Sequence, residues 1–236
     1  MAYECVASEF VPWERAVMPA IAYLQSVLFF ALAAVALFAS AGTLAIPGFW
    51  VYLAILGAVF VASFVLLDAD LFQERMRPGG ERPPLALRLF SLVLFAHWVL
   101  AGLDRGRFHW SDNVPPWLRI AGLIVVAAGY ALCLWAMTEN RFFSSVVRIQ
   151  TDRGQHVITT GPYAVVRHPG YAAAIPIMAA SGVALGSWLA TAVLVAASLP
   201  FLLHRVVTED RVLHAELPGY AAYAQRVRWR LVPGFW

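Results

Sequence analysis

The chain contains no lysine, and charged residues of all kinds make up only 13% of its 236 positions, against 61% that are hydrophobic. Soluble domains carry about a quarter charged residues. The shortage of charge therefore excludes an ordinary soluble protein and indicates a membrane protein. The length allows one compact bundle and no second large domain.

Several chemical signatures are also missing from the sequence. The two cysteines, Cys5 and Cys133, lie far apart and form neither a disulfide framework nor a zinc pattern. There is no Walker loop, no G-x-G-x-x-G, no G-x-S-x-G and no H-E-x-x-H. We therefore expect no metal site and none of the common soluble nucleotide-binding folds. The arginines stand between apolar segments, which indicates membrane topology and not a nucleic-acid partner.

Long apolar runs cover most of the chain. Four of them, 18–41, 47–67, 85–103 and 116–138, are each about twenty residues long, enough for a helix to cross a bilayer. A longer run at 171–204 would reach roughly 50 Å as one helix, too long for one crossing. Because glycines and Ser187 interrupt it, we expect two short helices joined by a tight turn near ALGS.

These runs predict an all-α, polytopic membrane bundle of about six transmembrane helices, the last two forming a helical hairpin. Residues 1–138 would hold the first four helices. Residues 139–236 would form a second region, made of the hairpin 171–204 and a C-terminal segment at the cytoplasmic face. Within this region, Pro169 predicts a new helix that begins around 169–171, because proline is favoured at the first helical position.

Two polar clusters adjoin the ends of apolar runs in the second region. The first is TTGPYAVVRHPGYAAAIP at 159–176, and the second comprises TEDRVLHAE with YAAYAQRVR, over 208–228. Taken singly, an arginine or histidine next to a membrane helix is usually an interfacial anchor. An acid such as Glu209, directly after an apolar run, marks a candidate functional site. The order and spacing of both clusters together favour function.

The pattern from Asn140 to the C-terminus resembles the isoprenylcysteine carboxyl methyltransferase and phospholipid methyltransferase superfamily of integral membrane enzymes. The matching motifs are VITTGPYAVVRHPGY, a helical hairpin, EDRVL and GYAAYAQRVRWRLVP. The first 110 residues match only as generic membrane helices. The resemblance implies that 139–236 is the catalytic region, that S-adenosylmethionine is the methyl donor, and that a lipophilic acceptor enters sideways from the bilayer.

The same resemblance implies roles for individual residues. Arg167 and Arg226 would orient the acceptor, and Glu209 would be the acidic ligand of the donor. The expected donor-binding residues are Gly161, Pro162, Tyr163, His168, Pro169, Tyr171, Glu209 and Asp210. The second acid departs from the pattern, because aspartate stands where the family has glutamate and its reach is one methylene shorter. We therefore expect Glu209 to be the more important of the pair.

The nature of the acceptor depends on proton chemistry. A carboxylate is already ionised at neutral pH, so its methylation needs positioning and a cation rather than a base. Arginine binds both oxygens of a carboxylate, and Arg226 therefore favours that acceptor. An amine or thiol would need a base, for which His168 and Glu209 are the candidates. The lysine-free, alanine- and arginine-rich composition is typical of a high-GC bacterium, so we expect a bacterial inner membrane and a lipid or small hydrophobic acid as substrate.

Three alternatives remain at this point. The acceptor could be a phospholipid amine or a thiol. The chain could instead be an NADPH-dependent membrane reductase of the sterol reductase type, whose last helices follow a related tyrosine and R-H-P-x-Y stretch. A membrane scaffold without a cofactor is the third possibility.

The arginine distribution predicts the topology. Thirteen arginines fall in segments that are cytoplasmic if the N-terminus is inside, whereas only Arg105 and Arg107 fall in the opposite segments. Reporters fused after Arg77, Asp152 and Trp236 should therefore give cytoplasmic signals, and reporters after Gly42 and Asp112 external ones. An external signal at Asp152 would contradict the proposed cytoplasmic face.

Overall fold

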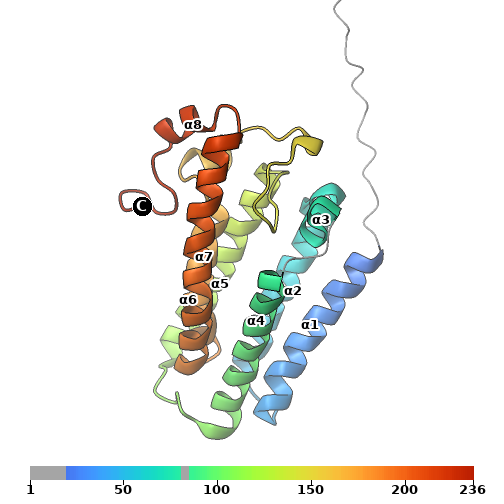
Figure 1. Ribbon diagram of the computed structural model, residues 1–236. Helices are drawn as coiled ribbons and strands as arrows, with labels where there is room; N and C mark the ends of the chain where they lie inside the picture. The colour runs from blue at the N-terminus through green and yellow to red at the C-terminus, as the bar shows by residue number, and fades with distance from the viewer. Residues whose placement is uncertain (1–19, 81–84) are drawn as a thin grey trace, which may run out of the picture.

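The computed structural model describes residues 20–80 and 85–236, so that Cys5, Arg15, Arg82 and the first two residues of the run 18–41 lie outside the described residues. The described chain is helical and contains no β-strand, as Figure 1 shows. Its α-helices are α1 (Ala20–Ala41), α2 (Pro47–Leu66), α3 (Ala69–Met76), α4 (Leu85–Leu103), α5 (Pro116–Glu139), α6 (Pro169–Ala184), α7 (Trp188–Glu216) and α8 (Tyr220–Arg226).

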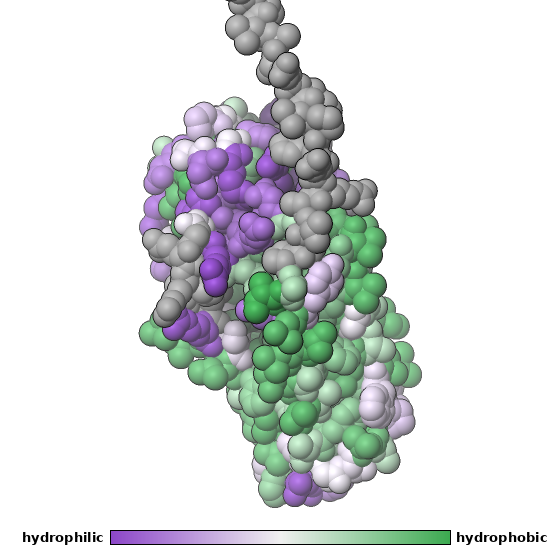
Figure 2. Space-filling model, turned by 90° about the vertical axis from the view of Figure 1, so that its right-hand side faces the viewer, coloured by the Kyte–Doolittle hydropathy of each residue, from purple (hydrophilic) through white to green (hydrophobic). Residues whose placement is uncertain are grey.

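Five of these helices, α1, α2, α4, α5 and α7, are long and apolar enough to cross a membrane, and α6 is a shorter apolar helix of 16 residues. Large apolar side chains are exposed along them, among them Val27, Val61 and Leu92. Figure 2 shows this apolar surface over the bundle and polar residues gathered at one end. The prediction of a polytopic helical membrane bundle is confirmed.

Prolines set the beginnings of several helices. Pro47, Pro116 and Pro169 each stand at the start of a helix, where the missing N–H is not needed and the fixed φ is already helical. The prediction that a helix begins at 169–171 is confirmed.

The expected hairpin is present, but its second helix is not short. Gly186, at φ 83°, makes the turn, and the Ser187 side chain caps α7 by accepting a hydrogen bond from the Ala190 N–H. α7 then runs for 29 residues to Glu216. The expectation of two short helices was wrong for α7 because the polar stretch TEDRVLHAE contains no helix breaker. The helix ends only before Pro218-Gly219.

Small residues let the helices approach closely. A Cβ on Gly122 or Gly129 of α5 would meet α6 at 2.9 Å from the Ala184 nitrogen and 2.5 Å from Ile177 Cγ1. In membranes such close backbone approach is a main source of helix association. α5 and α6 therefore form a rigid pair, and their polar ends carry the segment 140–168.

The two ends of the bundle differ in their chemistry. At one end, buried Asp104 accepts hydrogen bonds from the Ser111 backbone N–H at 2.9 Å and from the Ser187 hydroxyl. These bonds tie the α4–α5 connection to the α6–α7 turn. The other end carries α3, the long segment 140–168, α8 and the C-terminal tail (Figure 1). That end holds the candidate site.

Candidate functional site

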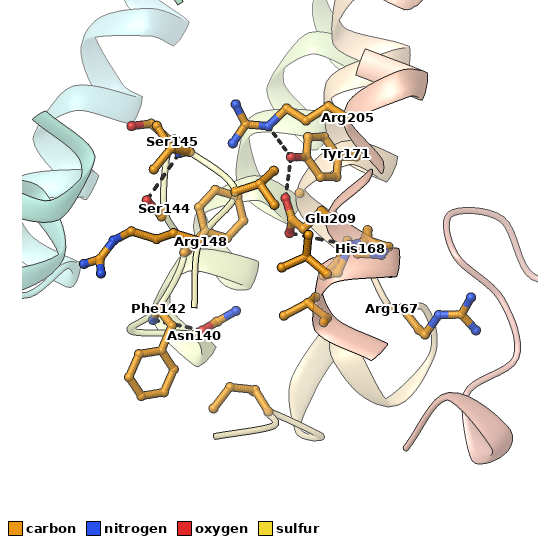
Figure 3. Close-up of a pocket in the computed structure, with 18 of the residues that line it drawn as sticks. Asn140, Phe142, Ser144, Ser145, Arg148, Arg167, His168, Tyr171, Arg205 and Glu209 are labelled. Carbon is orange, nitrogen blue, oxygen red and sulfur yellow. Dashed lines mark hydrogen bonds and ion pairs between the residues drawn. The ribbon is translucent and has the colours of Figure 1, made fainter. Parts of the chain in front are cut away.

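A cavity of about 320 Å³ lies where the polar end meets the helix bundle. Its walls come from the segment 142–158, the GPY…RHPGY stretch, α5, α7 and α8, with α3 and α4 contributing at the bundle side. Figure 3 shows several of the side chains that line it. The volume is at the lower end of the range for small-molecule sites.

The segment after α5 contains two short 3-10 helices, Thr151–Arg153 and Gly161–Ala164, and is otherwise ordered by side-chain hydrogen bonds. The Asn140 side chain donates to the Tyr163 hydroxyl at 3.1 Å and accepts from the Phe142 N–H at 2.9 Å. Gln150 is buried and donates to the Phe142 carbonyl at 2.7 Å. These bonds hold the cavity wall in place where no α-helix or strand does so.

Glu74 of α3 fastens this wall to the N-terminal half of the chain. It accepts hydrogen bonds from Arg148 at 2.7 Å and from the Ser144 hydroxyl at 2.8 Å. Burial alone would raise the pKa of Glu74, but the bonds from Arg148 and Ser144 outweigh it and lower the pKa. The Arg148 pKa is raised in turn, mainly by the hydrogen bond to Glu74. α3 is therefore part of the site.

The RHP motif pairs with the C-terminal tail through its backbone. The N–H groups of Arg167 and His168 donate to the carbonyls of Trp229 and Arg230, both at 2.9 Å. The Arg167 guanidinium donates to the Val227 carbonyl at 3.0 Å and to Asp210 Oδ1 at 3.0 Å. Figure 3 shows the Arg167 side chain pointing away from Glu209. Arg167 thus holds the C-terminal tail against the helix bundle.

Asp210 is the partner that these groups share. Its carboxylate is 2% exposed and accepts hydrogen bonds from Arg167, from the Tyr220 hydroxyl at 2.9 Å and from Arg230 at 2.9 Å. His168 Nε2 lies 3.2 Å from Oδ1 of the same carboxylate. Asp210, the second acid of the pair, is therefore engaged in structural contacts.

Glu209, one residue earlier on α7, lines the cavity instead. The Tyr171 hydroxyl donates to its Oε2 at 2.7 Å and in turn accepts from Arg205 Nε at 2.5 Å. His168 Nδ1 lies 3.7 Å from Glu209 Oε1. Burial would lower the His168 pKa, but its bonds to Asp210 and Glu209 outweigh burial and raise it. This shift favours the imidazolium form, which cannot accept a proton.

The structure divides the residues expected from the sequence into two groups. Six of them line the cavity: Tyr163, Arg167, His168, Pro169, Tyr171 and Glu209. The other four, Gly161, Pro162, Asp210 and Arg226, are not part of its lining. Gly161 takes the left-handed conformation at φ 54° that the GPY turn requires, and Arg226 is exposed on α8. Their assignment to donor or acceptor stays a prediction.

Sequence reasoning missed three cavity arginines, Arg75, Arg148 and Arg205. Arg205 stands four residues before Glu209, and this spacing places both side chains on one face of α7. The spacing could have identified Arg205 as a site residue. Arg75 comes from α3, far from the recognisable motifs, and the sequence carries no signal that points to it.

Comparison with known proteins supports the resemblance read from the motifs. Residues 121–215 match the model of the isoprenylcysteine carboxyl methyltransferase (ICMT) family. The chain is also 30% identical over 130 residues to the cobalt-zinc-cadmium resistance protein CzcN of Cupriavidus metallidurans. This match covers 55% of the chain and 56% of the relative, so the chain spans about half the length of the curated relative it matches. The family match confirms the suspected superfamily.

The shared contacts of Asp210 predict a large loss of stability when its charge is removed. Asp210→Asn leaves Arg167 and Arg230 without their anion, and breaking a buried ion pair from one side costs about 3–5 kcal/mol. The detergent-solubilised variant should unfold at a clearly lower temperature than the wild type. Asp152→Asn is the control, because this partner of Arg148 is exposed and should contribute little to stability. Equal unfolding temperatures for the two variants would refute the role of Asp210.

Proposed function

We propose that this chain, whose residues 121–215 match the ICMT family, is an integral membrane methyltransferase that uses S-adenosylmethionine and methylates a lipophilic acceptor, with a carboxylate favoured. The observation that carries this proposal is Glu209. Its carboxylate lines the cavity at the border between the polar end and the apolar bundle, held by Tyr171 and flanked by His168.

The cavity has the groups that such a donor requires. Glu209 can accept hydrogen bonds from the donor's ammonium group, and the rings of Tyr163 and Tyr171 offer faces for the positive sulfur. Gly170 lets the Phe143 ring of the cavity wall pack against the start of α6, because a Cβ there would lie 2.4 Å from that ring. When bound, S-adenosylmethionine supplies a methyl group activated by its sulfonium. The protein's part is to position the reactants and exclude water.

An acceptor that is already ionised suits the proton chemistry of the site. His168 is held between two acids, which favours its protonated form, and Glu209 accepts from Tyr171. An amine or thiol would need a free base here. Arg205 lines the cavity and its guanidinium donates to Tyr171, so it can turn remaining N–H groups toward a carboxylate. This supports a carboxylate above the phospholipid-amine and thiol alternatives.

The lining also supports entry from the bilayer. Phe90 of α4, Ala174 of α6 and Phe201 of α7 form an apolar side to the cavity. These helices are embedded in the membrane in our proposal, so a hydrocarbon chain can reach the site laterally. We place the protein in a bacterial inner membrane with both termini and the cavity at the cytoplasmic face.

An NADPH-dependent reductase would need cations for a 2′-phosphate in addition to those for its other groups. Arg148 and Arg167 line the cavity but are already paired, Arg148 with Glu74 and Asp152 and Arg167 with Asp210, so only Arg75 and Arg205 remain among the described lining arginines for these anionic groups. We therefore favour S-adenosylmethionine. The name of CzcN refers to metal resistance. The described part of the chain holds no group of three or more histidine, cysteine, aspartate or glutamate side chains that could bind a metal ion, and we propose no metal site.

The first test concerns the donor. Glu209→Gln keeps the size of the side chain and removes its charge, so S-adenosylmethionine should bind about ten- to a hundredfold more weakly, the value of one charge-assisted hydrogen bond. Glu216→Gln, an exposed position at the end of the same helix, is the control and should bind as the wild type does. Calorimetry with S-adenosylmethionine and with NADPH decides the cofactor. Wild-type protein that binds NADPH and not S-adenosylmethionine would refute the proposal.

The second test separates the two arginines on the acceptor side. Arg205→Gln should raise the KM for the acceptor and leave donor affinity nearly unchanged, because Arg205 reaches the cavity. Arg226→Lys tests the expectation from the motif that Arg226 orients the acceptor, with turnover as the readout. A fall in turnover for Arg226→Lys together with wild-type kinetics for Arg205→Gln would show that Arg226 and not Arg205 holds the acceptor.

A further inference from the structure

Arg75 is a cation in the cavity wall whose partner is not found within the described protein. It stands near the end of α3, is partly buried, and places its guanidinium 5.2 Å from the centre of the Phe143 ring. Among the described residues it makes no hydrogen bond or ion pair through that guanidinium. Burial lowers its pKa and the nearby charge of Arg205 lowers it further, whereas Cys133 and Tyr171 oppose the shift. An anion beside Arg75 would offset the cost of burying its charge.

The charges of the other cavity arginines are balanced in different ways. Arg148 is paired with Glu74 and Asp152, and Arg167 with Asp210. Among the described residues, Arg205 makes its hydrogen bond to a neutral group, the Tyr171 hydroxyl, and its guanidinium lies 6.0 Å from the centre of the Tyr171 ring. Glu209 is the only acid among the described residues that line the cavity. Two arginines therefore face one carboxylate, and an anionic ligand would restore the balance.

Arg75 also borders a second hollow of about 270 Å³ between α1, α2 and α3. Most of its wall is apolar, and the side chains that share it with Arg75 are Ala22, Gln25, Ser26, Phe29, Phe60, Phe72 and Met76. Arg75 is the residue that this hollow shares with the cavity. An amphiphile with an anionic head at Arg75 can lay its hydrocarbon chain against these aromatic walls.

We propose that Arg75 binds the anionic head group of the methyl acceptor and that the acceptor's hydrocarbon chain occupies the hollow between α1, α2 and α3. The acceptor is then a single-chain amphiphile whose carboxylate sits between Arg75 and Arg205. This inference rests on the proposed function for the identity of the reaction. Because Arg75 lies outside the region that matches the family, it is a specificity residue supplied by the N-terminal helices.

The test measures binding of three amphiphiles with the same fourteen-carbon chain: tetradecanoate, tetradecanol and tetradecylamine. The protein is held in phosphatidylcholine nanodiscs, and ligand is expressed per bilayer lipid so that partitioning is equal for all variants. The wild type should bind the carboxylate about ten- to a hundredfold more tightly than the alcohol, as expected for a charge-assisted hydrogen bond. Arg75→Gln should lose most of this preference, and Arg75→Lys should retain part of it.

Arg77→Gln is the matched control. Arg77 caps the same helix, is exposed and lines neither hollow, so its variant should keep the wild-type preference. A wild type without carboxylate preference, or an Arg75→Gln variant that keeps it, would overturn the proposal. The affinity for S-adenosylmethionine, measured in the same samples, separates the two claims. If the wild type does not bind S-adenosylmethionine, the proposed function is wrong. If only Arg75→Gln loses this binding, Arg75 contacts the donor and this inference is overturned.

A separate variant tests the position of the hydrocarbon chain. Ser26→Trp adds a large ring to the wall of the second hollow without touching the charge of Arg75. It should weaken the binding of tetradecanoate and leave the affinity for hexanoate nearly unchanged, because a short chain does not fill the hollow. Equal effects on both acids, or no effect on either, would place the chain elsewhere and overturn that half of the proposal.

Discussion

The polar end of the molecule depends on the buried carboxylate of Asp210. It binds the arginine and the histidine of the RHP motif at the start of α6, Tyr220 of α8 and Arg230 of the tail. Three segments, the RHP motif, α8 and the tail, thus meet at one charge on α7. A buried anion is costly unless each lone pair is used, and here its partners come from all three segments. The carboxylate therefore makes the arrangement of these segments specific.

The same arrangement leaves the neighbouring acid, Glu209, at the cavity. Successive residues on a helix point about 100° apart, so when Asp210 turns into the contact between α7, α8 and the tail, Glu209 turns into the cavity. His168 lies between the two carboxylates, whose hydrogen bonds raise its pKa and so favour its charged form. The acidic pair is thus divided into Asp210, which makes structural contacts, and Glu209, which lines the cavity.

The site is built from both halves of the chain. The segment 142–158 would be a loose loop without Glu74 of α3, which receives Arg148 and Ser144. The same short helix brings Arg75 to the bundle side of the cavity. In our proposals the recognisable C-terminal motifs hold the donor, and the N-terminal helices decide which acceptor enters. Such a division allows one methyl-transfer site to serve different acceptors by changing helices outside the motif region.

Much of this protein could be predicted from its sequence. The apolar runs are long enough to require membrane helices, proline and glycine set where α6 and α7 begin, and the GPY, RHP and acidic-pair motifs indicate the family. Those signals depend only on short stretches of sequence, so the features that they predict are present in the structure. The burial of Asp210, the exposure of Arg226 on α8 and the presence of Arg75 in the cavity were decided only by tertiary packing. They depend on which distant side chains share a helix face or a buried charge, and no local pattern records that.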